Sequence, residues 1–191
     1  MNIYDLKLNS LEQLPPVDNL PIISDCDGTI FEHGTTNLYP DVQMALGFVG
    51  CLALVSANPD KNLMAERKQI LNADYAVNSD KPIWYKGKLF NEIAKDITNN
   101  SSKVVILGDR PEADVGIAKL IFSHYGIEAF GIRIDRPNQP LPSKLDYLLK
   151  PTFKICSKVA KSTRQDTKFR PNFTQSVQNA ENFFMHRINL S

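Results

Sequence analysis

The sequence predicts an α/β fold, with a parallel sheet of about five strands and helices on both of its faces. Two observations lead to this class. Short apolar runs such as Pro21–Asp25 and Cys51–Val55 have the length of a strand and the continuous hydrophobicity of strands buried on both sides. These runs alternate with longer stretches of helical spacing, several of which follow a proline. Strands that alternate with helices form parallel sheets with right-handed crossovers.

The expected elements follow one another in the order of a Rossmann-like sheet. The strands are predicted at Pro21–Asp25, Cys51–Val55, Ala73–Val77, Val104–Leu107 and Ile127–Ile134. The helices are predicted at Asp41–Gly50, Pro59–Leu71, Pro82–Ile97 and Pro111–Tyr125, with Asn58 as the N-cap before Pro59. The leucines at positions 6, 8, 11 and 14 predict only a short amphipathic turn before the first strand.

The charges divide the chain into an acidic part and a basic part. Residues 150–191 carry eight lysines and arginines against two acids, whereas residues 1–149 carry 14 basic and 19 acidic side chains. We therefore expect an α/β core over residues 1–149 and a basic C-terminal extension over 150–191, helical in part at 172–189. A basic tail suits an anionic partner, and a solvated face without a partner explains it equally well.

Composition excludes several classes of protein. No apolar run approaches the roughly 20 residues of a membrane span, and Met1–Leu20 lacks the pattern of a signal peptide. The three cysteines, at positions 26, 51 and 156, are scattered and odd in number. They are typical of free thiols in a reducing compartment rather than of disulfides or a metal site. The expected location is the cytoplasm.

Two acids end the first predicted strand. Asp25 and Asp27 are directly followed by Gly28 and Thr29, so the chain turns where the charges lie. Carboxylates this close repel each other unless a proton or a cation compensates them, and Mg²⁺ prefers oxygen ligands. The pattern of a calcium loop does not fit, because Gly28 follows the second acid at once and Glu32 is too near.

Polar residues also end the later strands. Ser56 follows the second strand, Lys81 the third, and Gly108-Asp109 the fourth, with Asp114 five residues further on. Each alone has an ordinary explanation as a helix cap, a solvated lysine or a first-turn acid. Together, in order and at the carboxyl ends of parallel strands, they predict one site. Lys86 and Lys88 compete with Lys81 for the lysine position, and Asn58 either caps a helix or faces the site.

These motifs resemble those of the haloacid dehalogenase (HAD) superfamily, most of whose members are phosphohydrolases. Asp25-Cys26-Asp27-Gly28-Thr29 is similar to the first motif, and Ser56, Lys81-Pro82 and Gly108-Asp109 follow in the order of the family. The resemblance implies a HAD-like fold and a Mg²⁺-dependent phosphatase that hydrolyses a phosphomonoester. It implies that Asp25 is the nucleophile, forming an aspartyl-phosphate, and that Asp27 is the general acid and base.

The resemblance also implies roles for the remaining residues. Carboxylates of Asp25 and Asp109 and the backbone carbonyl of Asp27 would hold the Mg²⁺, and Asp114 would complete or support its ligand shell. Ser56 would donate a hydrogen bond to the phosphoryl group. Lys81 would neutralise the nucleophile and the phosphate.

The spacing of the motifs leaves no room for an inserted cap domain. About eleven residues separate Thr29 from Asp41 and about two dozen separate Ser56 from Lys81, fewer than a small domain needs. Residues 1–135 are similar to HAD subfamily IIIA, which includes the phosphatidylglycerophosphate phosphatases. An open site without a cap suits a large or surface-displayed substrate, or an oligomer in which a neighbour covers the mouth of the site.

The basic extension leaves two interpretations open. Its apolar stripe at 173, 177, 180, 184 and 188 and its positive charge would suit peripheral contact with an anionic membrane. The same stripe is typical of a helix packed on a core or a partner subunit. A nucleic acid is not the expected partner, since no recognised binding motif is present. The alternative function is a non-catalytic HAD-like binding protein whose tail docks RNA or a ribosome.

Overall fold

The structure is a computed structural model, and it describes residues 4–15, 17, 20–46, 51–79, 86–97 and 101–136. All of these belong to the first of the two units into which the chain divides, Met1–Leu141. The basic extension expected over 150–191, with its helix at 172–189, lies outside the described residues. The same is true of Lys81 and Pro82.

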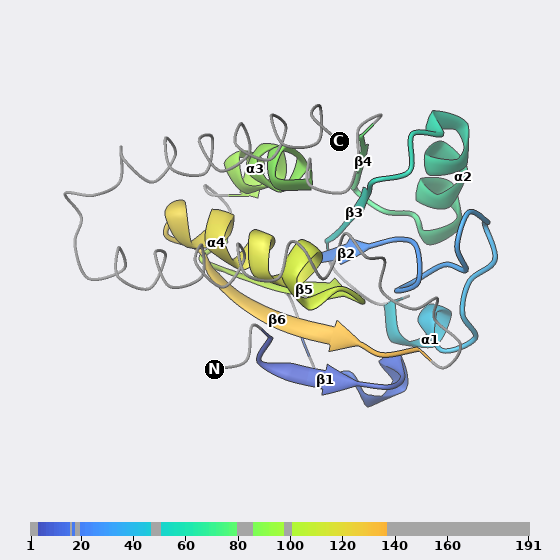
Figure 1. The fold of residues 1–191 in the computed structure, drawn as a ribbon, viewed down its shortest axis with the longest axis horizontal. Coiled ribbons are helices and arrows are strands. Elements are labelled where there is room, and N and C mark those ends of the chain that lie inside the picture. The colour runs from blue at the N-terminus through green and yellow to red at the C-terminus, as the bar shows by residue number, and fades with distance from the viewer. Residues whose placement is uncertain are drawn as a thin grey trace, which may run out of the picture. The chain divides into compact units, whose positions relative to one another are not determined.

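The described residues form an α/β fold around a parallel sheet of six strands. The strands are β1 (Leu6–Leu8), β2 (Ile22–Asp25), β3 (Leu52–Ser56), β4 (Tyr75–Asn78), β5 (Lys103–Gly108) and β6 (Glu128–Ile134). Their order across the sheet is β1-β6-β5-β2-β3-β4, and Figure 1 shows β1 and β6 side by side at one edge. The α/β class is confirmed, and five of the strands lie within two residues of their predicted bounds.

The sixth strand is β1, where the sequence predicted only an amphipathic turn. Leu6–Leu8 pairs in parallel with β6, from Leu6 opposite Ile132 to Leu8 opposite Ile134. Asp5 strengthens this edge, because its carboxylate accepts the backbone N–H of Gly131 at 2.7 Å. A strand of three residues is too short to show a period of two. Leucines at 6 and 8 therefore fitted a turn as well as a strand.

Helices cover both faces of the sheet. On one face α1 (Val42–Leu46) and α2 (Lys61–Leu71) lie over a core that includes Ile22, Leu54 and Leu107. On the other face α3 (Lys86–Ile97) and α4 (Ile117–His124) pack on the alternate strand residues. These alternate residues are Ile23, Ala53, Val55, Val104 and Ile106, all buried. Successive side chains of a strand point to opposite faces, so each strand contributes to both cores.

The helices α1 and α2 begin one and two residues later than the sequence predicted. The N-cap of α2 is Asp60, whose carboxylate accepts the N–H groups of Asn62 and Leu63 at 2.9 and 3.1 Å. The cap predicted at Asn58 is therefore wrong. The Asn58 side chain instead accepts the N–H of Asp60 at 3.0 Å, which forms a turn before the helix. Asp41 directly precedes α1, but its carboxylate accepts hydrogen bonds from Ser10, Leu11 and Arg136.

Asp41 forms a buried junction between the two ends of the described chain. Its Oδ2 accepts the backbone N–H of Leu11 at 2.5 Å, the hydroxyl of Ser10 at 2.9 Å and Nη1 of Arg136 at 2.5 Å. Arg136 follows β6, and its Nη2 donates to the carbonyl of Thr29 at 2.8 Å. The guanidinium also lies 4.3 Å above the ring of Tyr39. This junction holds the loop after β2 against the segment after β6.

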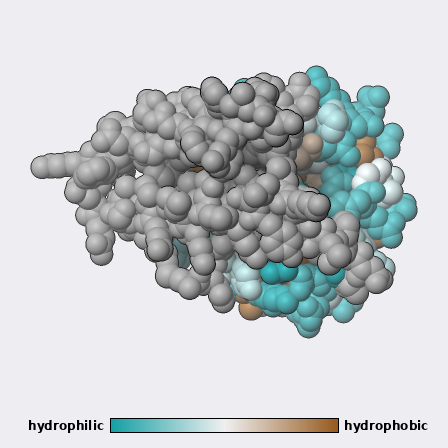
Figure 2. All heavy atoms as spheres, in the orientation of Figure 1, coloured by the Kyte–Doolittle hydropathy of each residue, from teal (hydrophilic) through white to brown (hydrophobic). Residues whose placement is uncertain are grey.

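The surface of the described part is mainly polar. On the face shown in Figure 2 the coloured residues are mostly hydrophilic, and hydrophobic ones occur as small separate spots. The large hydrophobic side chains exposed among the described residues are Met44, Ile70, Tyr75 and Phe130. None of the described helices has the length and the apolar character needed to cross a bilayer.

Replacing Asp41 with alanine is expected to lower the free energy of unfolding by about 3 to 5 kcal/mol, because Arg136 is left buried without its carboxylate. Urea unfolding followed by circular dichroism measures the loss. The matched control is Lys103→Ala, which removes the exposed ion pair with Glu128 at 3.5 Å and should cost less than about 1 kcal/mol. Equal losses in the two variants would contradict the importance of the junction.

Candidate metal and phosphoryl site

The site lies where the order of the strands reverses direction. From β2 the chain proceeds to β3 and β4 on one side, and then crosses to β5 and β6 on the other. Asp25 ends β2 opposite Val55 of β3, while Ser24 pairs with Leu107 of β5. Loops that leave β2, β3 and β5 diverge here, which opens a crevice at the carboxyl ends of the strands. A pocket of about 350 Å³ occupies this crevice.

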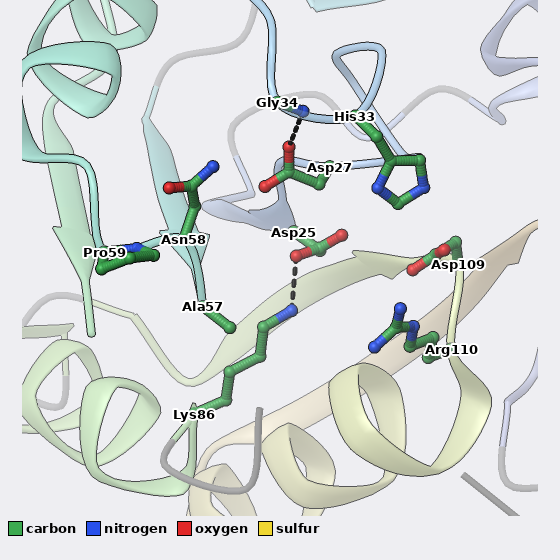
Figure 3. A pocket seen from close by; sticks show the side chains of 10 residues that line it. All are labelled: Asp25, Asp27, His33, Gly34, Ala57, Asn58, Pro59, Lys86, Asp109 and Arg110. Atoms are coloured by element: carbon green, nitrogen blue, oxygen red, sulfur yellow. Dashed lines mark hydrogen bonds and ion pairs between the residues drawn. The ribbon is translucent and has the colours of Figure 1, made fainter. Parts of the chain in front are cut away.

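Asp25 lies on the floor of the pocket and contacts a buried lysine (Figure 3). Nζ of Lys86, at the start of α3, forms a short ion pair with Asp25 Oδ1 and lies 2.6 Å from Asp114 Oδ1. The side chains of Lys86, Asp25 and Asp114 are 3%, 4% and 0% exposed, so water screens this contact little. The Thr29 hydroxyl donates to the other Asp25 oxygen at 3.2 Å.

Three carboxylates converge beside this lysine. One oxygen each of Asp25, Asp109 and Asp114 lie within 4.8 Å of one another. Burial raises the pKa of Asp25 to about 6, with Lys86 opposing this rise and Asp114 adding to it. Burial, together with the charges of Asp114 and Asp25, raises the pKa of Asp109 well above its usual range. The raised pKa values mean that the site resists the negative charge of three ionised acids, which one ammonium group does not balance.

This acidic group could bind a metal ion. Its three convergent ligands are all carboxylate oxygens, which hard divalent cations prefer over nitrogen or sulfur. A divalent cation would also supply the positive charge that Lys86 alone does not provide. Asp25, Asp109 and Asp114 are the residues that would hold it. All three were predicted as metal ligands from the sequence, whereas the carboxylate of Asp27 lies outside the group.

The carboxylate of Asp27 is held by four donors. Nη2 and Nη1 of Arg67 donate to its Oδ1 and Oδ2 at 2.7 and 3.2 Å. The N–H of Gly34 adds a bond to Oδ1 at 2.8 Å, and the Ser56 hydroxyl adds one to Oδ2 at 3.1 Å. Burial alone would raise the pKa of Asp27, but the bonds from Arg67, Gly34 and Ser56 hold it below its usual range.

Asp114 reaches the site through a wide turn. Residues Pro111–Gly116 form a π-helical segment before α4, where the sequence predicted one continuous helix from Pro111. The side chain of Asp114 folds back to accept the N–H of Arg110 at 2.9 Å. A Cβ on Gly108 would lie only 2.4 Å from the Cβ of Asp114, so this approach needs glycine there. Such widened turns are frequent at functional sites.

The structure brings most of the predicted site residues together. Asp25, Asp27 and Asp109 line the pocket, as does Asn58, whose place in the site the sequence left open. Asp114 lies behind them, and Ser56 is bound to Asp27. Lys81, preferred for the lysine position, falls outside the described residues. The described lysine in contact with Asp25 is its competitor Lys86, and Lys88 is exposed.

Three residues of the site were not predicted. Arg67 of α2 has a fully buried guanidinium, and His33 and Arg110 line the pocket. An arginine in the middle of an amphipathic helix gives no signal of burial. Arg110 stands directly after Asp109, and this position was the available clue. His33 lies in a loop, where the sequence does not fix the direction of a side chain.

Mg²⁺ is expected to stabilise the protein near neutral pH, because a cation that binds the folded acids raises the free energy of unfolding, by about 1 to 3 kcal/mol at a large excess. The effect should shrink as the pH falls through about 6, where a proton occupies Asp25 and competes. Thermal unfolding with and without Mg²⁺ tests this. Asp109→Asn should lose the effect, and Asp96→Asn on the exposed face of α3 should keep it.

Replacing Gly28 with alanine is expected to disturb the site as well as the backbone. Gly28 has φ +81°, and an added Cβ would lie 2.8 Å from His33 Nε2 and 2.9 Å from Asp109 Oδ2. The control is Gly126→Ala, at φ +74° with no atom within 4 Å of the new Cβ. Both variants should lose about 1 to 2 kcal/mol of stability. Only Gly28→Ala should weaken stabilisation by Mg²⁺, and an equal weakening in both would contradict the close approach.

Comparisons of the chain with models of protein families, with curated proteins and with solved structures found no match. The chemistry that the site can perform follows from its own residues. These are a buried carboxylate with an ammonium group on it, two further acids beside it, and a pocket that opens above them.

Proposed function

We propose that the protein is a Mg²⁺-dependent phosphatase of the HAD type, which hydrolyses a phosphomonoester through an aspartyl-phosphate on Asp25. The observation that supports this most is the contact of Asp25 with Lys86 on the floor of the pocket, beside the acidic group. Phosphate monoesters hydrolyse very slowly in water, and their catalysis depends on positioning and on compensation of charge. The pocket offers both.

Asp25 is the proposed nucleophile. It ends the central strand, its backbone carbonyl accepts the Ser24 hydroxyl at 2.8 Å, and its side chain is held by Thr29 and Lys86. A carboxylate fixed in this way can attack phosphorus with little loss of freedom. In this proposal Lys86 has the role that the resemblance gives to a lysine. Its charge would offset the negative charge of the nucleophile and of the phosphoryl oxygens as they approach each other.

The metal in this proposal is Mg²⁺. Asp25, Asp109 and Asp114 would hold it, and the resemblance adds the backbone carbonyl of Asp27. When bound, Mg²⁺ supplies charge stabilisation to the transferring phosphoryl group. On the side of the protein, Arg110 lines the pocket and presents a guanidinium, which suits phosphate oxygens. Ser56 donates to Asp27, so binding a phosphoryl group would require its hydroxyl to turn.

A large or surface-displayed substrate is supported by the short connections around the pocket. Between Thr29 and Asp41 the described residues form a loop, and between Ser56 and Ser79 they form α2 and β4. Neither stretch holds a covering domain. Phosphatidylglycerophosphate, the substrate of the subfamily that the motifs resemble, belongs to this class. A cytoplasmic location agrees with the free cysteines Cys26 and Cys51.

The test is hydrolysis of 4-nitrophenyl phosphate by the wild type and by Asp25→Asn, each with and without Mg²⁺. The wild type should turn over only with Mg²⁺. Asp25→Asn should lose at least about a thousandfold in kcat, because an amide cannot form the acyl-phosphate. Asp96→Asn, remote from the pocket on α3, should keep full activity.

A second outcome would favour a different class of function. If the wild type and Asp25→Asn turn over equally slowly on lipid, sugar, nucleotide and protein phosphates, the enzyme proposal fails. The protein would then fit the alternative expected from its basic tail, a HAD-like binding protein without catalysis.

A further inference from the structure

We propose that Asn58 selects the alcohol half of the substrate, by donating a hydrogen bond from its Nδ2 to an oxygen of the leaving group. The preferred substrate is then a phosphomonoester whose alcohol carries a hydrogen-bond acceptor, rather than one with a plain alkyl chain. This inference rests on the proposed phosphatase function and extends it, because it adds a residue that determines specificity. The bonds that hold Asn58 and its place in the pocket support it.

Three of the four polar groups of Asn58 are bound to the protein itself. Its backbone N–H donates to the hydroxyl oxygen of Ser56 at 3.0 Å, and its backbone carbonyl accepts Nδ2 of Asn78 at 3.2 Å. Its side-chain Oδ1 accepts the N–H of Asp60 at 3.0 Å. Pro59 further restricts the backbone of the residue before it to extended conformations. Asn58 therefore has little freedom to lose when a substrate binds.

The fourth polar group is the amide nitrogen, Nδ2. The bond from Asp60 sets the direction of the amide, because only the amide oxygen can accept an N–H. Within the part of the chain that the structure describes, no group accepts a hydrogen bond from this nitrogen. Asn58 lines the pocket, and Figure 3 shows its nitrogen on the side of Asp27 and its oxygen on the side of Pro59. A fixed donor thus faces the space in which a substrate would bind.

The leaving group would occupy the part of the pocket next to Asn58. In a displacement at phosphorus, the attacking and leaving oxygens lie roughly in line. Asp25 lies on the floor, so the leaving group points away from the floor, toward the walls to which Asn58 and Gly34 contribute (Figure 3). The volume of about 350 Å³ is in the range of sites for small molecules. Part of an alcohol therefore fits beside the phosphoryl group.

The donor would discriminate between alcohols by the hydrogen bond that it keeps or loses. Before a substrate binds, water in the open pocket can accept from Nδ2 of Asn58. An alkyl chain that displaces this water leaves the N–H without a partner, whereas an ether, hydroxyl or carbonyl oxygen replaces the lost bond. Sites built around such a donor reject substrates that lack the matching acceptor.

The experiment compares two alkyl phosphates that differ at one position, 2-methoxyethyl phosphate and butyl phosphate, in the full chain with Mg²⁺. The ether oxygen of the first, which accepts hydrogen bonds and donates none, replaces a methylene group of the second. The wild type should prefer the ether by at least about tenfold in kcat/KM, measured as release of phosphate. In Asn58→Ala the ratio of the two kcat/KM values should fall about tenfold.

Two further variants separate the donor from the turn before α2. Asn58→Asp keeps an oxygen that accepts the N–H of Asp60 but has no amide N–H, so its ratio should fall as far as that of Asn58→Ala. Its added charge repels both phosphates alike and cancels in the ratio. Asn78→Ala removes the bond to the carbonyl of Asn58 and leaves the amide in place, so it should keep the ratio of the wild type.

The ratio is measured in one preparation with both substrates, so it does not depend on how much of a variant is folded. A wild type that shows no preference for the ether, or an Asn58→Asp variant that keeps the preference, would overturn the assignment. Both results leave the phosphatase proposal standing, because they are obtained with an active enzyme. If the wild type hydrolyses neither of these esters nor 4-nitrophenyl phosphate, the phosphatase proposal itself fails, and the role of Asn58 fails with it.

Discussion

The structure depends on the placement of one lysine among acids at the end of the central strand. Asp25 and Asp114 are almost completely buried, and Lys86 joins them from the start of α3. Without this ammonium group, two carboxylates would share a dry space in which repulsion is weakly screened. With it, the acids can remain close together, and Asp109 can complete a group of three oxygens. Burial thus brings the negative charges close together, and the positive charge of Lys86 offsets their repulsion in the folded protein.

Two buried arginines perform a similar task for the loop after β2. Arg67 joins a carboxylate, Asp27, to a backbone carbonyl and lies 4.8 Å from the Phe31 ring. Arg136 joins Asp41 to the Thr29 carbonyl and lies over Tyr39. Each guanidinium satisfies groups from segments far apart in the sequence, and its planar, weakly hydrated shape suits such burial. The loop after β2 is therefore held from both sides.

The fold and the acidic centre could largely be predicted from the sequence, because both follow from local signals. Apolar runs indicate the strands. In a parallel sheet the residues at or after the carboxyl ends of the strands lie close together, and Asp25, Asp109 and Asp114 are such residues. Residues placed by tertiary contacts could not be found in this way. Arg67 and Arg136 carry no sign of burial in their neighbours, and Leu6–Leu8 becomes a strand only because β6 is beside it. The lysine was ambiguous because three candidates lie within eight residues.

The pairing of β1 with β6 joins nearly the first described residues to nearly the last. Arg136, directly after β6, completes the same closure by holding the Thr29 carbonyl. During synthesis the loop of the first motif therefore emerges more than a hundred residues before its last anchor does. Contacts of such long sequence separation form late and slow the folding of a domain. We therefore expect the acids of the site to reach their final arrangement only after this whole length of chain has been made.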